Sequence, residues 1–321
     1  MSRRALLIGA LTTTLIVDAS SAAAEYRAER QMTLRSGGTF MLDSDTGAVT
    51  VTGDSPSGAL VSITSRRDDF ASRYDVRFEE GSDGITVSVK RRGTWLADMF
   101  HSAWGDNTRI VIRVPRSTPT RVSTSGGSIR ASALGNAKLR TSGGSIDAAE
   151  LAGAALLSTS GGSITVRTVG GNLDADTSGG GIRASDIRGA VRVDTSGGSI
   201  VVENAAGDVL ASTSGGGVRV TGAGGRVDAH TSGGSVDVLF TRGNARGGDL
   251  ATSGGGITAG VDPGVGLTID AGSSGGDVNT DVPVAIRGAA SRRELRGDLN
   301  GGGPLLRMRT SGGGVRIASI R

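Results

Sequence analysis

The chain of 321 residues has no cysteine, six prolines and two histidines, and aromatic residues make up 3% of it. Without cysteine it forms neither a disulfide nor a lipid anchor on cysteine, and no zinc-binding pattern of cysteine and histidine is present. No serine lies in a Gly-x-Ser-x-Gly turn between a strand and a helix, which many hydrolases use. We therefore expect no metal, no cofactor and no catalytic residues.

The net charge of the chain is also small, because 35 lysines and arginines are nearly balanced by 31 aspartates and glutamates. No basic run is interleaved with aromatic residues in the way that nucleic-acid-binding surfaces require. After the first 24 residues, no apolar run is long enough to cross a membrane. We expect no nucleic-acid partner and no transmembrane segment in the mature chain.

Glycine is abundant, with 55 residues, and much of it lies in a repeated motif. The motif is Thr-Ser-Gly-Gly followed by Ser or Gly and then by Ile or Val. Its copies begin at Thr124, Thr141, Thr159, Thr177, Thr195, Thr213, Thr231, Thr252 and Thr310, with a variant copy at Ser273. A fixed step, here 18 residues between Thr141 and Thr231, is the signature of a repeat architecture.

Each copy has the pattern of two short strands. In one copy, apolar residues lie two positions apart at Ile182 and Ala184, and again at Val191 and Val193. A spacing of two places alternate side chains on opposite faces of a strand. We expect Gly189, between the two strands, to supply a positive φ at a corner of the coil.

One such coil cannot bury its apolar face alone, but identical coils stacked at strand spacing can. We therefore predict an all-β fold, a parallel β-solenoid of about ten 18-residue coils, with Ile164, Ile182 and Ile200 in one column and the threonines in another. A left-handed hexapeptide helix would need apolar residues at Arg188 and Asp194, and a calcium β-roll would need aspartates that the copies lack.

The chain divides into three parts by sequence. Residues 1–24 resemble a secretory signal, with Arg3 and Arg4 before an apolar stretch and small residues at the end. Residues 25–115 form a β-rich N-terminal cap in which 35–40 and 47–53 look like halves of a coil. Residues 116–321 form the solenoid, with an irregular segment near 283–303 that is either a degenerate coil or a loop.

Two groups of residues are candidates for a site. Trp95, Phe100 and Trp104 form an apolar cluster that is either a docking patch for a partner or a lid over the end of the core. Asp249 and Asp270 would be vertical neighbours if successive coils stay in register, as the carboxylates of a polysaccharide lyase or hydrolase must be.

Outward positions on the second strand carry charges of both signs, as at Asp174, Arg192 and Asp228. We interpret this as a solvated face. His230 lies beside this face, and we interpret it as a surface substitution.

The Thr-Ser-Gly-Gly ladder, the segment Gly-Ala-Val-Thr-Val-Thr-Gly at 47–53 and the ending Leu-Asn-Gly-Gly-Gly-Pro at 299–304 resemble the bacterial DUF4097 family of candidate adhesins. The resemblance implies an exported β-solenoid with an adhesin-like role and no catalytic residues. We expect a non-enzymatic protein of the periplasm, cell surface or extracellular space, whose partner is an envelope glycan or protein. The alternatives are a polysaccharide-active enzyme and a self-associating structural element.

Overall fold

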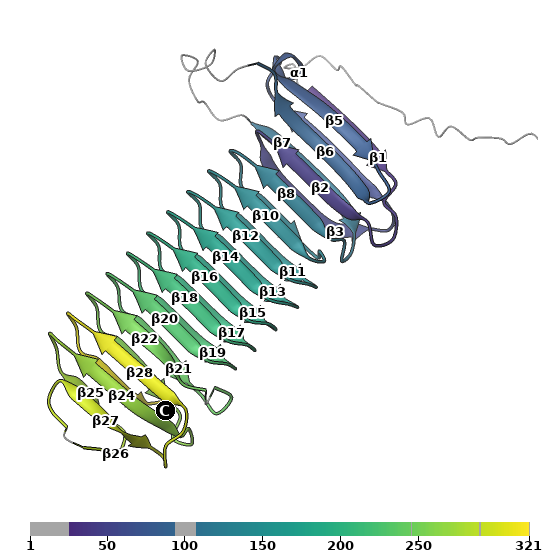
Figure 1. Cartoon of the computed structure of the whole chain (residues 1–321). Helices are drawn as coiled ribbons and strands as arrows, with labels where there is room; N and C mark the ends of the chain where they lie inside the picture. Colours follow the sequence, from purple (N-terminus) through teal and green to yellow (C-terminus); the bar gives the residue numbers. More distant parts are fainter. Residues whose placement is uncertain (1–25, 94–106, 245, 289, 321) are drawn as a thin grey trace, which may run out of the picture.

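The computed structural model describes residues 26–93, 107–244, 246–288 and 290–320. Within these ranges the strands form two long sheets that run along a rod (Figure 1). One short helix, α1 (Phe70–Arg73), lies near the N-terminal end. This is the β-solenoid that the sequence predicts.

The two sheets, sheet A and sheet B, each follow the length of the rod. The strands of sheet A are, in spatial order from the N-terminal end, β1 (Tyr26–Met32), β4 (Ala59–Ser65), β7 (Thr108–Pro115), β3 (Ala48–Ser55), β9 (Ile129–Ser132), β11 (Ile146–Leu151), β13 (Ile164–Val169), β15 (Ile182–Ile187), β17 (Ile200–Ala205), β19 (Val218–Ala223), β21 (Val236–Phe240), β23 (Ile257–Val261), β29 (Val315–Ser319) and β25 (Val278–Thr280). The strands of sheet B are, from the C-terminal end, β26 (Val284–Ile286), β27 (Glu294–Leu299), β24 (Leu267–Ser273), β28 (Leu305–Thr310), β22 (Gly248–Thr252), β20 (Val227–Thr231), β18 (Val209–Thr213), β16 (Val191–Thr195), β14 (Leu173–Thr177), β12 (Ala155–Thr159), β10 (Ala137–Thr141), β8 (Thr120–Thr124), β2 (Thr39–Ser44), β6 (Gly84–Arg91) and β5 (Tyr74–Glu80).

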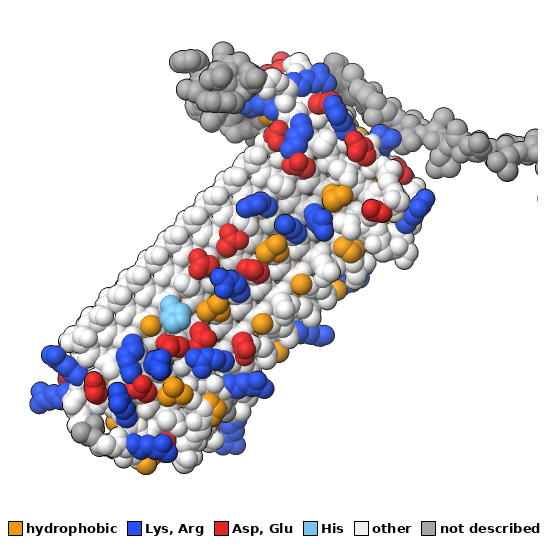
Figure 2. Space-filling view, in the orientation of Figure 1, with side chains coloured by type: hydrophobic (Ala, Val, Ile, Leu, Met, Phe, Trp, Pro, Cys, Tyr) orange, Lys and Arg blue, Asp and Glu red, His pale blue; other side chains and the backbone are white. Residues whose placement is uncertain are grey.

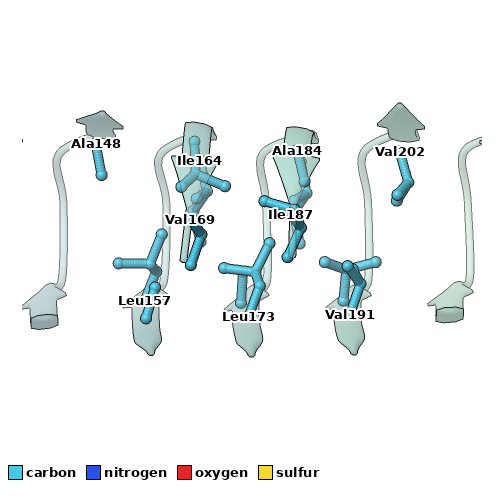
Figure 3. Close-up of a cluster of buried hydrophobic side chains, with 14 of the residues drawn as sticks. Ala148, Leu157, Ile164, Val169, Leu173, Ala184, Ile187, Val191 and Val202 are labelled. Atoms are coloured by element: carbon cyan, nitrogen blue, oxygen red, sulfur yellow. The ribbon is translucent and has the colours of Figure 1, made fainter. Parts of the chain in front are cut away.

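Each regular coil supplies one strand to sheet A and the next strand to sheet B, and coils pair in parallel. Ile164 pairs with Ile182, and Ile182 pairs with Ile200, so the predicted column is confirmed. These side chains are buried between the two sheets, where they meet aliphatic residues such as Leu173 and Val191 (Figure 3). The stack is stabilised because each coil buries its aliphatic side chains against the equivalent side chains of the neighbouring coils.

The predicted role of the mid-coil glycines is wrong. The backbone takes a positive φ of 57° to 58° earlier in each coil, at Thr168, Asp186 and Asn204. A Cβ on Gly189 would instead lie 2.7 Å from the backbone nitrogen of Asn172 in the preceding coil. Glycine is needed there because the backbones of successive coils approach too closely to admit a side chain.

The threonine column is confirmed, and its hydroxyl groups link successive coils. Thr195 pairs with Thr177 across the coils. Its hydroxyl donates to the carbonyl oxygen of Gly180 at 2.7 Å and accepts from the amide of Gly198 at 3.4 Å. The hydroxyl of the buried Thr195 therefore has two hydrogen-bond partners, and it supplies one partner to each of two backbone groups in neighbouring coils.

At the N-terminal end, β2 and β3 form a coil that pairs in parallel with β8 and β9. Thr39 and Phe40 of the first predicted half and most of the second predicted half, 47–53, therefore lie in one coil. β6 and β7 extend the two sheets in parallel, and β5, β4 and β1 add antiparallel strands. Phe70 is fully buried here, with its ring 4.5 Å from Tyr26 and 4.8 Å from Tyr74.

At the C-terminal end, the last coil in the sequence is not the last in space. β28 lies between β22 and β24, and β29 lies between β23 and β25. Residues 283–303 are neither a degenerate coil nor a simple loop, because β26 and β27 pair with each other and β27 pairs antiparallel with β24.

Candidate functional site

A groove with a volume of about 810 Å³ runs across the outer face of sheet B from β8 to β20. Seven strands at ~4.8 Å spacing give it a length of about 29 Å. Exposed aliphatic side chains such as Ala154, Leu156 and Leu210 line it, and Figure 2 shows basic, acidic and apolar side chains interspersed on this face. The groove is open along the rod and suits an extended partner better than a compact one.

One wall of the groove is formed by the residues just before each strand. The side-chain oxygen of Asn136 accepts a hydrogen bond from the amide of Ala154 at 2.8 Å, and Asn172 does the same for Ala190 at 3.0 Å. The asparagine side chains therefore provide hydrogen-bond acceptors for backbone N–H groups of the next coil. Because alanine, Ala154 or Ala190, occupies the equivalent position in the coil after each asparagine, this wall is low there.

The other wall is a column of outward side chains, one from the second residue of each strand, which we call the outer column. Along the groove it contains Arg121, Lys138, Leu156, Asp174, Arg192, Leu210 and Asp228, and Asp249 of β22 continues the column beyond the groove. Leu156 and Leu210 are 38% and 37% exposed. The sequence shows the mixed charges, but our interpretation of a solvated face misses both the groove and the order of the column.

Asp249 and Asp270 are not vertical neighbours, so that expectation is wrong. Both pair with Arg307 of the inserted strand β28, which separates them. The carboxylate of Asp270 lies 2.7 Å from Nη2 of Arg309 and 3.2 Å from Nε of Arg296. The coil insertion explains the error, because the 21-residue steps do not show that a later strand enters between them.

The environment of Asp270 keeps its carboxyl group ionised. Partial burial raises its pKa, but the hydrogen bonds and positive charges of Arg309 and Arg296 outweigh burial and hold the pKa below its ordinary value. A general acid must carry a proton near neutral pH, and an enzyme achieves this by raising the pKa of a carboxyl group. Asp270 therefore has the environment of a structural ion pair.

His230 lies on β20 and points outward, partly exposed, two residues after Asp228 of the outer column. Its cross-strand neighbours are Ser212 and Ala251. In the part of the chain that the structure describes, no three histidine, aspartate or glutamate side chains are grouped to hold a metal ion. Trp95, Phe100 and Trp104, like the signal segment 1–24, lie outside the described residues.

No helix in the described ranges has both the length and the apolar character needed to span a membrane. No curated protein is similar enough in sequence to count as a match.

Three solved structures are similar to the chain over most of its length. A candidate adhesin from Bacteroides fragilis is 12% identical, with 94% of this chain and 98% of that one covered and a TM-score of 0.35. A candidate lipid-binding protein from Parabacteroides distasonis is 10% identical, with 92% and 97% covered and a TM-score of 0.43. A candidate cell adhesion protein from Clostridium sporogenes is 12% identical, with 92% and 100% covered and a TM-score of 0.25.

The model of one protein family, Toastrack DUF4097, matches residues 41–301. The match begins in β2, spans every regular coil and ends after β27. The chain therefore belongs to the Toastrack DUF4097 family.

Proposed function

We propose that this protein is an exported, non-enzymatic component of the bacterial cell envelope with an adhesin-like binding role. The groove across sheet B is the observation on which this proposal rests most heavily. The interior of the coils is nearly uniform, whereas the outer column changes from one coil to the next. A rigid rod with a uniform core and a varied outer surface suits recognition of an extended partner.

Export is part of the proposal and rests on the sequence. Arg3 and Arg4 precede the apolar stretch 5–17, and Ala22, Ala23 and Ala24 provide small residues for cleavage before Glu25. The mature chain would then act in the periplasm, at the cell surface or outside the cell, where a glycan or protein of the envelope is the partner.

The enzyme alternative has lost its main support. A glycan lyase or hydrolase needs two carboxylates close together on one face. Arg307 lies between Asp249 and Asp270, and arginines surround Asp270. We therefore propose no catalytic role for either carboxylate.

Retention by envelope fractions tests the proposal. The mature chain is incubated with purified peptidoglycan, outer-membrane and extracellular polysaccharide fractions, and bound protein is measured after washing. The variant Ala154→Trp, which fills the groove, should reduce retention about 10-fold or more, since a bulky group in a binding site removes several contacts.

The matched control is Thr165→Trp, which adds the same side chain to the outer face of sheet A. It should bind like the unmodified chain. Retention by no fraction would contradict the proposed binding role. Equal retention of both variants would show that binding does not use the groove.

A further inference from the structure

The outer column has an order that is its own complement when it is read backwards. We compare the order from β8 to β22 with the same order taken from β22 to β8. At each position a cation in one order corresponds to an anion in the other, and a leucine corresponds to a leucine. The complementary pairs are Arg121 with Asp249, Lys138 with Asp228, Leu156 with Leu210, and Asp174 with Arg192. All eight positions obey this order, and the next positions in the register, Met41 and Arg307, lie outside it.

We propose that the outer face of sheet B binds a second copy of this chain, with the two rods antiparallel. The two-fold axis would lie parallel to the strands and pass between β14 and β16. Asp174 of each copy would then face Arg192 of the other copy, and Leu156 would face Leu210. A two-fold interface requires a surface that complements itself, and the outer column meets that requirement.

The two central charges of this column remain available for a partner, whereas the anions of β20 and β22 already pair with neighbouring arginines. In the described part of the chain, Asp174 and Arg192 form no ion pair, although they lie on adjacent strands. On the outer face of sheet A, by contrast, Arg167 lies 3.3 Å from Asp147 of the neighbouring strand. Charges of alternating sign that face their opposites across an interface set its register and reject other alignments.

The face is large enough for a weak but specific dimer. Eight strands at ~4.8 Å spacing extend about 34 Å, and a strand of five residues is about 17 Å long. Such a face covers roughly 600 Å² on each copy, or about 1,200 Å² for the pair, which is at the low end for specific interfaces. We therefore expect a dissociation constant of about 1–100 µM.

A second row of outward residues limits the affinity. Two residues further along the same strands, Asp176 would face Asp194 of the other copy on both sides of the axis. Like charges that face each other oppose association. Removing one of them, in the variant Asp194→Asn, should therefore tighten the dimer by about fivefold.

This inference deepens the proposed function, because it names a second copy as one partner of the groove face and rests on that face being a binding surface. The two can fail separately. The dimer is measured on purified protein, whereas envelope retention is measured on cell fractions.

Sedimentation velocity of the purified mature chain from 1 to 300 µM is the first measurement. We expect a concentration-dependent shift from monomer to dimer that weakens as sodium chloride is raised from 50 to 500 mM, since salt screens exposed ion pairs. A chain that stays monomeric at 300 µM and low salt would overturn the proposal.

Charge reversal then tests the register. Asp174→Arg and Arg192→Asp should each weaken the dimer about 100-fold, because each variant places like charges face to face twice. An equimolar mixture of the two variants should regain dimerisation, since each contact then pairs an arginine of one variant with an aspartate of the other. The double variant, carrying both changes in one chain, should also dimerise.

Arg183→Asp on the outer face of sheet A is the matched control and should leave the dimer unchanged. Failure of the mixture and of the double variant to dimerise, while every variant keeps the far-ultraviolet circular dichroism of the parent, would overturn the antiparallel arrangement. Loss of the dimer in the control would place the interface elsewhere.

Discussion

A methyl group added to Gly180 would test the close stacking of the coils. Its Cβ would lie 2.2 Å from the carbonyl oxygen of Gly162 and 2.5 Å from its carbonyl carbon. Real Cβ atoms essentially never approach other atoms within 3.0 Å. Because the obstructing atoms belong to the backbone of the preceding coil, no side-chain movement relieves the clash, and the coils must separate locally.

The cost follows from this geometry. Overpacking of a well-packed interior costs about 1–3 kcal/mol, and a clash with backbone on a stacked coil belongs at the upper end. We expect Gly180→Ala to lower the free energy of unfolding by about 3 kcal/mol. At about 2 °C for each kcal/mol in a chain of this size, the melting temperature should fall by about 6 °C.

Gly179, its neighbour, provides a control with the same change. A Cβ on Gly179 would lie 3.1 Å from the carbonyl oxygen of Gly161, which a small shift can relieve. Neither glycine has a positive φ, so backbone strain does not separate the two variants. Thermal unfolding followed by circular dichroism should show Gly179→Ala within about 2 °C of the parent. Equal losses in both variants would refute the stacking argument.

Four further changes test other parts of the structure. Thr168→Gly should raise the free energy of unfolding by about 1 kcal/mol, because a β-branched residue there has φ of 58°; a loss in urea unfolding would contradict this. Thr195→Val should cost about 2 kcal/mol in the same assay, since it removes the hydroxyl that links Gly180 and Gly198; no loss would show that this link is dispensable. Ile182→Ala should cost about 2–5 kcal/mol because its side chain is buried between coils; a cost below about 1 kcal/mol would argue against burial. Asp270→Asn should cost about 2 kcal/mol at pH 7. Because the folded-state pKa of Asp270 is lowered, this contribution is complete above the unfolded value of about 3.9 and disappears as the pH falls through the folded value; a difference between parent and variant that does not shrink as the pH is lowered would contradict the ion-pair argument.

The regular coils were predictable because each copy repeats the same local pattern. Spacing of two at Ile182 and Ala184 indicates a strand, and the 18-residue step places Ile182 over Ile164 without any long-range information. The threonine column follows from the same step. In this part of the chain, local pattern and tertiary register agree.

The C-terminal order was not predictable from local pattern. The copies at Ser273 and Thr310 have similar glycine turns, and nothing in either copy states which one stacks on the coil that begins at Thr252. In the structure β24 takes the outer place, where it also pairs antiparallel with β27, and such tertiary pairings are not visible in the local pattern. The expectation for Asp249 and Asp270 failed for this reason.

The role of the glycines and the order of the outer column were missed for different reasons. Glycine is compatible both with positive φ and with close backbone approach, and sequence does not distinguish the two. The order of the outer column is a property of eight coils together, and a single charge such as Asp174 or Arg192 is as compatible with a solvated face as with an interface.

Distances between pairs of spin labels test most directly that the coils stack at strand spacing in the order described. The chain has no cysteine, so cysteines introduced at two exposed serines of the glycine turns are labelled without background. Paired with Ser142, labels at Ser232, Ser311 and Ser274 are five, seven and eight coils away. We predict separations of about 24, 34 and 38 Å by pulsed electron paramagnetic resonance. A shorter distance to Ser274 than to Ser311, or distances that do not grow in proportion to the number of coils, would contradict the structure.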